Sequence, residues 1–215
     1  MKNIFLILLL LCLVQCNKSN NDYELLDGIS AQGIDLSHHN SNIAWNKLNI
    51  DFIYLKATEG VTYQDPKYLE YRDSCINNKI LVGAYHFFSC STSGIEQFKN
   101  FKNTVGNKFD LIPVLDIERC TITKQKLQKE VNDWINACYD YYKVYPIIYT
   151  SDLFYIKNLN GNELIEKCLV WLGDIGTYSV ITPHIMRQIE IKKISGTKYP
   201  VDYNHLYISI NKIKI

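Results

Sequence analysis

The amino-acid sequence predicts an α/β protein, a TIM-like β/α barrel with eight strands whose last third lacks helices. Eight short apolar segments recur along the chain. Their nearly continuous apolar character is typical of strands that are buried on both faces of a parallel sheet. Helical patterns separate the earlier segments, but the helical signal disappears after Gly173. A barrel with a degenerate end accounts for both observations.

The expected strands can be placed from these apolar segments. In chain order they cover residues 31–37, 51–57, 79–88, 111–118, 145–151, 168–174, 184–190 and 199–206. An open doubly wound sheet is the alternative arrangement. It is disfavoured because the chain contains neither GxGxxG nor GxxxxGK[ST], the glycine-rich phosphate loops found in many such sheets.

The expected helices lie between the strands. Asp65-Pro66 opens a helix that runs to Asn78, because proline fits the first turn of a helix. Apolar residues at helical spacing predict a long helix from Thr123 to Tyr142. The other two expected helices are Ser93 to about Val105 and the short segment Glu163 to Lys167.

The N-terminal segment predicts export. Lys2 precedes an apolar run from Ile4 to Val14, which is too short to span a bilayer and is typical of a secretory signal peptide. The run ends in Leu13-Val14-Gln15-Cys16, which resembles the lipobox of bacterial lipoproteins, with Cys16 as the lipidated residue. Gln15 departs from the usual small residue, so secretion without an anchor is the alternative. We therefore expect a signal peptide over 1–16, a tether over 17–30 and one β/α-barrel domain over 31–215.

Composition excludes several classes of function. The 215 residues suit one domain with a sizeable core. The formal net charge of +1 gives no field that would favour nucleic acid or an anionic membrane. Five cysteines follow Cys16, without CxxC or zinc-ligand spacing, and most are expected to be small buried apolar residues. A disulfide is possible after export, but its pairing cannot be inferred from the sequence.

Acidic residues at expected strand ends are the main functional signal. Asp116 and Glu118 close the fourth strand in the segment PVLDIE, and Asp35 and Asp202 lie in the first and last strands. Residues two apart on a strand point to the same face, roughly 6.5–7 Å apart. Active sites of β/α barrels form at the C-terminal strand ends, so these carboxylates are expected to converge there.

Crowded carboxylates cannot all ionise in a partly desolvated cleft, so one is expected to stay protonated near neutral pH. A protonated acid beside ionised partners is the arrangement that cleavage of a glycosidic bond needs. Glu118 is the best candidate for the acid because it reaches furthest and is outermost. A single DxE pair is weak evidence, since solvated strand ends, helix caps and metal sites also use acids. No HExxH motif, GxSxG motif or candidate nucleophilic cysteine is present.

Several motifs together resemble glycoside hydrolase family 25, the N-acetylmuramidase lysozymes. The resemblance spans about Gly33 to Leu206 and keeps the family's order. The matching segments are GIDLSHHN (33–40), LKATEG with Tyr63 and Asp65-Pro66, VGAYHFF (82–88), PVLDIE (113–118), PIIYT (146–150) and VDYN (201–204). It implies a flattened, modified barrel with eight strands and about five helices.

The resemblance also implies a chemistry and a set of site residues. The reaction would cleave the β-1,4 bond between N-acetylmuramic acid and N-acetylglucosamine in peptidoglycan, with no metal or organic cofactor. Glu118 would be the general acid, Asp116 would stabilise charge and orient the acetamido group, and Asp35 and Asp202 would complete the acidic floor. The residues expected to line the sugar cleft are Lys56, Tyr63, Tyr85, Tyr149 and Trp171. The expected partner is the peptidoglycan strand, bound by a monomer.

Two segments depart from the family pattern. The sixth strand, near Trp171, lacks the usual tyrosine, and the seventh keeps only Gln188 of the usual WQYS. DxxDxDxE chitinases are a poor match, because Val114 and Leu111 stand where their earlier acids belong. A barrel that binds peptidoglycan without cutting it, and a glycosidase acting on a related N-acetylated glycan, are the alternative functions. A cytoplasmic enzyme is disfavoured by the N-terminal segment.

Overall fold

The computed structural model of the chain describes residues 24–173, 175–176 and 180–215. The predicted signal peptide, Cys16 and the first part of the predicted tether lie outside these residues. Residues 24–30 belong to the expected tether and follow the edge of the barrel, where the N–H groups of Leu26 and Ser30 donate to the carbonyls of Tyr207 and Leu206. Among the described residues, no helix is long and apolar enough to cross a membrane.

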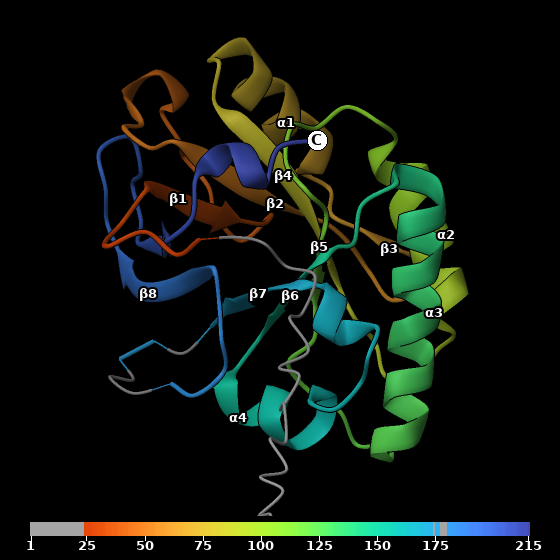
Figure 1. The fold of residues 1–215 in the computed structure, drawn as a ribbon. Coiled ribbons are helices and arrows are strands. Elements are labelled where there is room, and N and C mark those ends of the chain that lie inside the picture. The colour runs from red at the N-terminus through yellow and green to blue at the C-terminus, as the bar shows by residue number, and fades with distance from the viewer. Residues whose placement is uncertain (1–23, 174, 177–179) are drawn as a thin grey trace, which may run out of the picture.

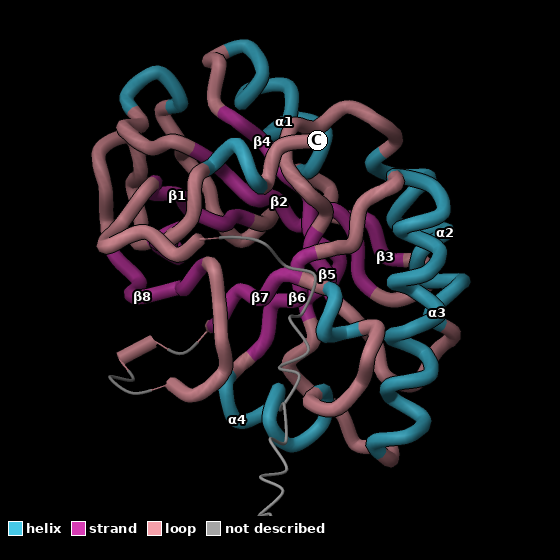
Figure 2. The backbone as a smooth tube through the Cα atoms, viewed as in Figure 1, coloured by secondary structure: helices cyan, strands magenta, loops and turns pink. Residues whose placement is uncertain are grey.

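Eight strands form the closed barrel that the sequence predicts (Figures 1 and 2). Pairing of the first strand with both the second and the last closes the sheet. The barrel strands are β1 (Ala31–Leu36), β2 (Phe52–Glu59), β4 (Leu81–Phe87), β5 (Val114–Asp116), β6 (Ile147–Thr150), β7 (Leu169–Leu172), β8 (Met186–Lys192) and β9 (Val201–Leu206). Each lies within or overlaps an expected strand, so the predicted fold class is confirmed.

The last strand runs against the others. β9 pairs antiparallel with both β8 and β1, whereas the pairs from β1 through β8 are parallel. The N-terminal end of β9 therefore meets the C-terminal ends of its neighbours. This direction places Asp202, the second residue of β9, directly opposite Asp35 of β1. A short hairpin strand, β3 (Tyr63–Gln64), pairs with the end of β2 and was not predicted.

Two helices begin at the caps that the sequence predicts, whereas the first begins at Tyr68, two residues after Pro66. α1 (Tyr68–Asn77), α2 (Gly94–Val105) and α3 (Lys124–Tyr142) are three of the four expected helices. Ser93 and Thr123 cap α2 and α3 by accepting backbone N–H groups three residues on. Figure 1 shows α2 and α3 side by side along one flank of the barrel.

The segment after β6 differs from the prediction. α4 (Asp152–Phe154) continues into a π-helical turn (Tyr155–Leu159), and neither was expected. The expected helix over 163–167 is only a 3₁₀ turn (Ile165–Lys167). Its five-residue signal is too short for a stable α-helix, because most helical stability comes from a packed apolar face.

Strand alternation divides the core into two layers. Phe52 and Tyr54 of β2 point into the barrel and pack with Trp171, whereas Ile53 and Leu55 point outward. The outward layer packs against the helices and includes Trp134 of α3. Buried apolar area on both faces of the strands stabilises the sheet. It also keeps the strand ends at fixed positions, which the site requires.

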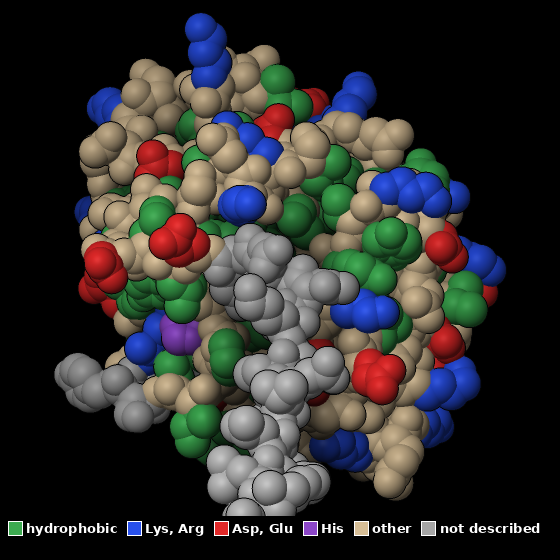
Figure 3. Space-filling model, viewed as in Figure 1, with side chains coloured by type: hydrophobic (Ala, Val, Ile, Leu, Met, Phe, Trp, Pro, Cys, Tyr) green, Lys and Arg blue, Asp and Glu red, His purple; other side chains and the backbone are tan. Residues whose placement is uncertain are grey.

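The cysteines behave as the composition suggests. Cys75, Cys138 and Cys168 are buried thiols among apolar side chains. Cys90 and Cys120 form a disulfide between the loop after β4 and the loop after β5. On the face seen in Figure 3, basic and acidic side chains are interspersed, in keeping with the small net charge.

Candidate active site

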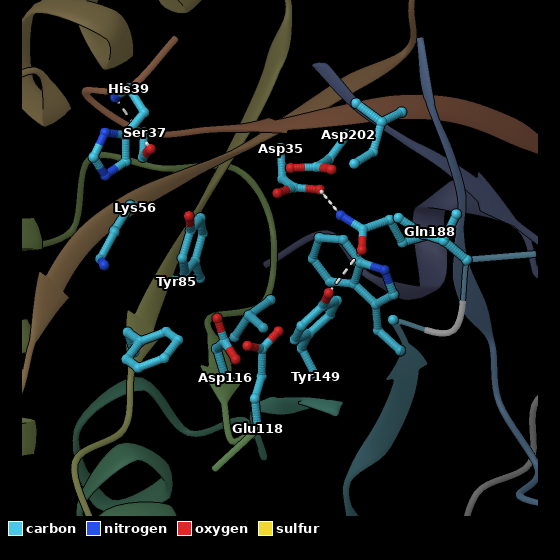
Figure 4. Close-up of a pocket in the computed structure, with 16 residues that line it drawn as sticks. Asp35, Ser37, His39, Lys56, Tyr85, Asp116, Glu118, Tyr149, Gln188 and Asp202 are labelled. Carbon is cyan, nitrogen blue, oxygen red and sulfur yellow. Dashed lines mark hydrogen bonds between the residues drawn. The ribbon is translucent and has the colours of Figure 1, made fainter. Parts of the chain in front are cut away.

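A cavity of about 420 Å³ opens at the barrel mouth, where the C-terminal ends of the parallel strands meet. It lies where active sites form in β/α barrels. Its lining consists of Asp35, Ser37, His39, Lys56, Tyr85, Phe87, Val114, Asp116, Glu118, Tyr149, Trp171, Gly173, Ile175, Gln188, Ile191 and Asp202. Eight of the nine residues predicted for the cleft are therefore brought together, and Figure 4 shows most of them.

The DxE segment reaches the cavity through strand alternation. Leu115 and Ile117 are fully buried in the outer layer under the helices. Asp116 and Glu118 alternate with them and therefore point to the cavity. Asp116 is buried, whereas Glu118 is half-buried at the outer edge. The predicted same-face arrangement of the two carboxylates is thus present.

Asp35 and Asp202 form a second carboxylate pair, which faces Asp116 and Glu118 across the cavity (Figure 4). Burial, followed by the charge of Asp202, raises the pKa of Asp35 to about 8. Burial and Glu118 raise the pKa of Asp202 as well. Asp35 therefore holds a proton near neutral pH.

Two amide side chains fix the Asp35 carboxyl group, and the sequence did not predict their role. Asn204 Nδ2 and Gln188 Nε2 donate to Asp35 Oδ2 at 2.8 and 3.3 Å. Trp171 Nε1 donates to Asn204 Oδ1 at 3.1 Å, and the Tyr149 hydroxyl donates to Gln188 Oε1 at 2.8 Å. The aromatic residues thereby orient both amides. Gln188 and Asn204 lie inside the motif segments, which could have marked them as site residues. The sequence could not show that their amide groups bind Asp35.

Asp116 carries an unsatisfied buried oxygen. Among the described residues, its Oδ1 atom has no hydrogen-bond partner. Burial, followed by the nearby Glu118 and Asp35 carboxylates, raises the pKa of Asp116 well above its usual range. A buried acceptor without a partner costs free energy in the folded state. In a cavity that admits ligand, this oxygen is available to a substrate N–H or O–H group.

Lys56 and Tyr63 occupy one rim of the cavity. Lys56 Nζ forms an ion pair with Glu59 at 2.6 Å and lies 4.8 Å from the centre of the Phe87 ring. Tyr63 is the one predicted cleft residue outside the lining, because β3 carries it to the exposed edge of the sheet. Its hydroxyl lies 3.2 Å from His38 Nδ1.

The histidines are held by hydrogen bonds. His38 Nδ1 lies 2.7 Å from the buried carboxylate of Asp65. His86 is fully buried, with Thr58 and Gln97 as hydrogen-bond partners, and burial lowers its pKa to about 4. Within the described ranges, no three His, Cys, Asp or Glu side chains are arranged to hold a metal ion.

The model of the glycosyl hydrolases family 25 matches residues 34–193. The chain belongs to this family. A bacterial lysozyme structure from Streptomyces coelicolor superposes on the barrel with a TM-score of 0.79 and 25% identity, covering 87% of this chain and 96% of that one. A family 25 glycosyl hydrolase from Bacillus anthracis gives a TM-score of 0.77 at 24% identity, covering 86% and 92% of the two chains, which supports the fold.

The chain is also similar in sequence to several curated proteins. Lysozyme M1 of Streptomyces globisporus is 31% identical over 73% of this chain and 59% of its own length. YegX of Escherichia coli, whose activity is uncharacterised, is 34% identical over 60% of this chain and 51% of its own length. The chain spans about half the length of the curated relatives it matches.

Proposed function

We propose that this family 25 protein is a peptidoglycan hydrolase that cleaves the β-1,4 bond between N-acetylmuramic acid and N-acetylglucosamine. The observation that carries the proposal is the convergence of four carboxyl groups, Asp35, Asp116, Glu118 and Asp202, on one cavity. Two relatives, from Streptomyces globisporus and Clostridium acetobutylicum, are named as lysozymes, which supports the choice of substrate.

In the proposed mechanism, Glu118 donates its proton to the glycosidic oxygen while the bond from that oxygen to the anomeric carbon breaks. Positive charge then develops on the muramic acid ring, and the oxygen atoms of the carboxyl groups that face it stabilise this charge. Water finally supplies the hydroxyl group at the anomeric carbon, and its second proton restores Glu118. These steps need no metal or organic cofactor.

Asp116 has a separate proposed role beside the acid. Its unpartnered Oδ1 atom would accept a hydrogen bond from the acetamido N–H of the muramic acid residue. Such a bond would fix the ring against Tyr85 and Tyr149, which line the same cavity. Trp171 would contribute mainly by holding Asn204, since it is 2% exposed.

The products of digestion test this proposal. Purified peptidoglycan would be digested with the chain lacking residues 1–16, reduced with borohydride and analysed by mass spectrometry. Reduced muramic acid at the new ends is the expected result. Reduced glucosamine would keep the hydrolase but overturn the bond assignment. Binding without any cleavage would indicate the alternative, a glycan-binding barrel.

The cellular location is proposed from the N-terminal segment. Export followed by lipidation of Cys16 would anchor the domain in the cell envelope through the tether. Mass spectrometry of the mature N-terminus tests this. A diacylglyceryl group on Cys16 is the expected result, and an unmodified N-terminus further along the chain would indicate a secreted protein.

A further inference from the structure

Glu118 also lines a second cavity. It has a volume of about 370 Å³ and shares only Glu118 with the acidic cavity at the barrel mouth. We call it the α4 cavity, because most of its walls come from α4 and the π-helical turn that follows. Its other lining residues are Cys120, Ser151, Leu153, Phe154, Lys157 and Asn158.

Because Glu118 lines both cavities, the two cavities can hold the two parts of the substrate that its bond joins. A general acid stands beside the bond that it cleaves, so the two sugars joined by that bond lie on either side of it. The ring that develops positive charge belongs in the acidic cavity. With that placement, the leaving sugar and the glycan beyond it would extend past Glu118 toward the α4 cavity.

The α4 cavity carries a positively charged side chain, whereas the cavity at the barrel mouth is rich in carboxyl groups. Apart from Glu118, no acidic side chain of the described residues lines the α4 cavity. Lys157 is exposed and forms no ion pair with the part of the chain that the structure describes. Ser151 Oγ accepts the N–H of Phe154 at 3.2 Å, so its own hydroxyl hydrogen remains for another acceptor.

The α4 cavity also offers a defined apolar surface. Leu153 is 79% exposed, and Phe154 is half-buried beside it. Cys120, which the disulfide to Cys90 holds in place, also lines the cavity. A cation and a hydroxyl group beside an apolar surface suit a ligand that combines aliphatic groups with a carboxylate.

We propose that the α4 cavity binds a carboxylate of the stem peptide carried by the departing part of the glycan, with Lys157 as its cationic partner. This inference rests on the proposed function, since it takes Glu118 as the acid and peptidoglycan as the substrate. The enzyme therefore prefers glycan strands that keep their peptides to strands that have lost them. Because an exposed ion pair is weak, the preference due to Lys157 is about threefold.

The experiment compares two forms of one substrate. Glycan strands with intact stem peptides, and the same strands stripped of peptides by an amidase, are digested, and the ratio of their kcat/KM values is measured. We expect a ratio above one that Lys157→Gln lowers about threefold and Lys157→Arg restores. Raising the salt concentration to about 1 M should also lower the ratio, because salt screens exposed charges.

The control variant is Lys99→Gln on α2, where the lysine pairs with Glu96 and lines neither cavity. It should leave the ratio unchanged. The inference is overturned if Lys157→Gln leaves the ratio unchanged, or lowers both kcat/KM values equally.

A failure of the proposed function gives a different result, in which the wild-type chain cleaves neither substrate. Binding of the two strand preparations, measured by calorimetry, then decides the inference independently. Weaker binding of the peptide-bearing strands by Lys157→Gln upholds a carboxylate site. Equal binding by wild type and variant overturns it.

Discussion

At the scale of single residues, the site is dominated by carboxyl groups whose burial opposes ionisation. Asp35 and Asp116 both lie where water is largely excluded, and their pKa values are raised mainly for that reason. Two amide groups donate hydrogen bonds to Asp35 and partly offset the cost of its burial. Asp116 has one oxygen without a hydrogen-bond partner among the described residues. The two acids should therefore respond differently to substitution.

Asp116→Asn should lower activity and raise stability together. At neutral pH the unfolded carboxyl group is ionised, but the folded site disfavours the charge, so a neutral side chain of similar shape favours folding. We expect kcat to fall about a hundredfold, in line with loss of one stabilising group in a preorganised site. Turnover of peptidoglycan and thermal unfolding measure the two effects.

Asp140→Asn, on the exposed face of α3, should change neither. A lower melting temperature for Asp116→Asn would contradict this account.

Gln188→Met should weaken catalysis through Asp35. The substitution removes a donor to Asp35 Oδ2 and leaves the Tyr149 hydroxyl without its acceptor. The pKa of Asp35 should then rise further, because a hydrogen bond to the ionised form has been lost. We expect kcat/KM to fall about tenfold, with the limb of the pH profile that reports Asp35 displaced to higher pH. Tyr149→Phe keeps the amide and should give a smaller displacement in the same direction. A lower kcat/KM with an unchanged profile would assign Gln188 to substrate binding instead.

At the scale of elements, strand direction and loop connections place these residues. The antiparallel course of β9 is what sets Asp202 opposite Asp35. The loop after β5 carries Glu118 and, two residues on, Cys120, whose disulfide ties this loop to the one after β4. The position of the proposed acid thus depends on a covalent link between two barrel loops.

Replacing both Cys90 and Cys120 with serine should lower stability and activity. The disulfide joins residues 30 apart in the sequence, and closing a loop of this length stabilises a protein by about 3.6 kcal/mol in the chain-entropy model. Urea denaturation should show a loss of about this size. The kcat value should fall more than KM rises, because a mobile Glu118 affects proton donation more than binding.

Cys75→Ser serves as a comparison, since that buried thiol has no disulfide partner. Unchanged kcat in the double variant would show that the loop holds Glu118 without the link.

At the scale of the whole molecule, stability should depend on pH through the acidic cavity. The folded-state pKa of Asp35 is about 8, against an ordinary value of 3.8, so the folded protein binds more protons between these limits. The contribution of this group to the free energy of unfolding therefore falls as pH rises from about 4 to about 8. Urea denaturation at several pH values should show a shallower dependence for Asp35→Asn than for wild type. Parallel curves for the two proteins would contradict the raised pKa.

Much of the fold and part of the site follow from local sequence features. Eight apolar segments became the eight barrel strands, and Ser93 and Thr123 began their helices as expected. The direction of β9 was not predictable, because an apolar strand looks the same whichever way its neighbours run. The π-helical turn after α4 depends on tertiary packing, and its sequence lacks a periodic apolar face.

In the site, too, features set by neighbouring residues were predictable, whereas features set by distant residues were not. Asp116 and Glu118 share a face because of strand alternation, which needs only their spacing. The pairing of Asp35 with Asn204 joins residues 169 apart in the sequence, and only the closed barrel brings them together. The position of Tyr63 beside the cavity, outside its lining, depends on long-range pairing in the same way, since the β3 hairpin turns it toward the exposed edge.

Glu118→Gln measures the central claim most directly. The variant keeps the size and hydrogen-bonding capacity of the side chain but cannot donate the proton to the glycosidic oxygen. On purified peptidoglycan we expect kcat to fall by about a thousandfold or more, within the range lost with a general acid. Circular dichroism and pull-down on insoluble peptidoglycan should show that folding and binding persist. Turnover within tenfold of wild type, with folding and binding intact, would contradict the assignment of Glu118 as the acid.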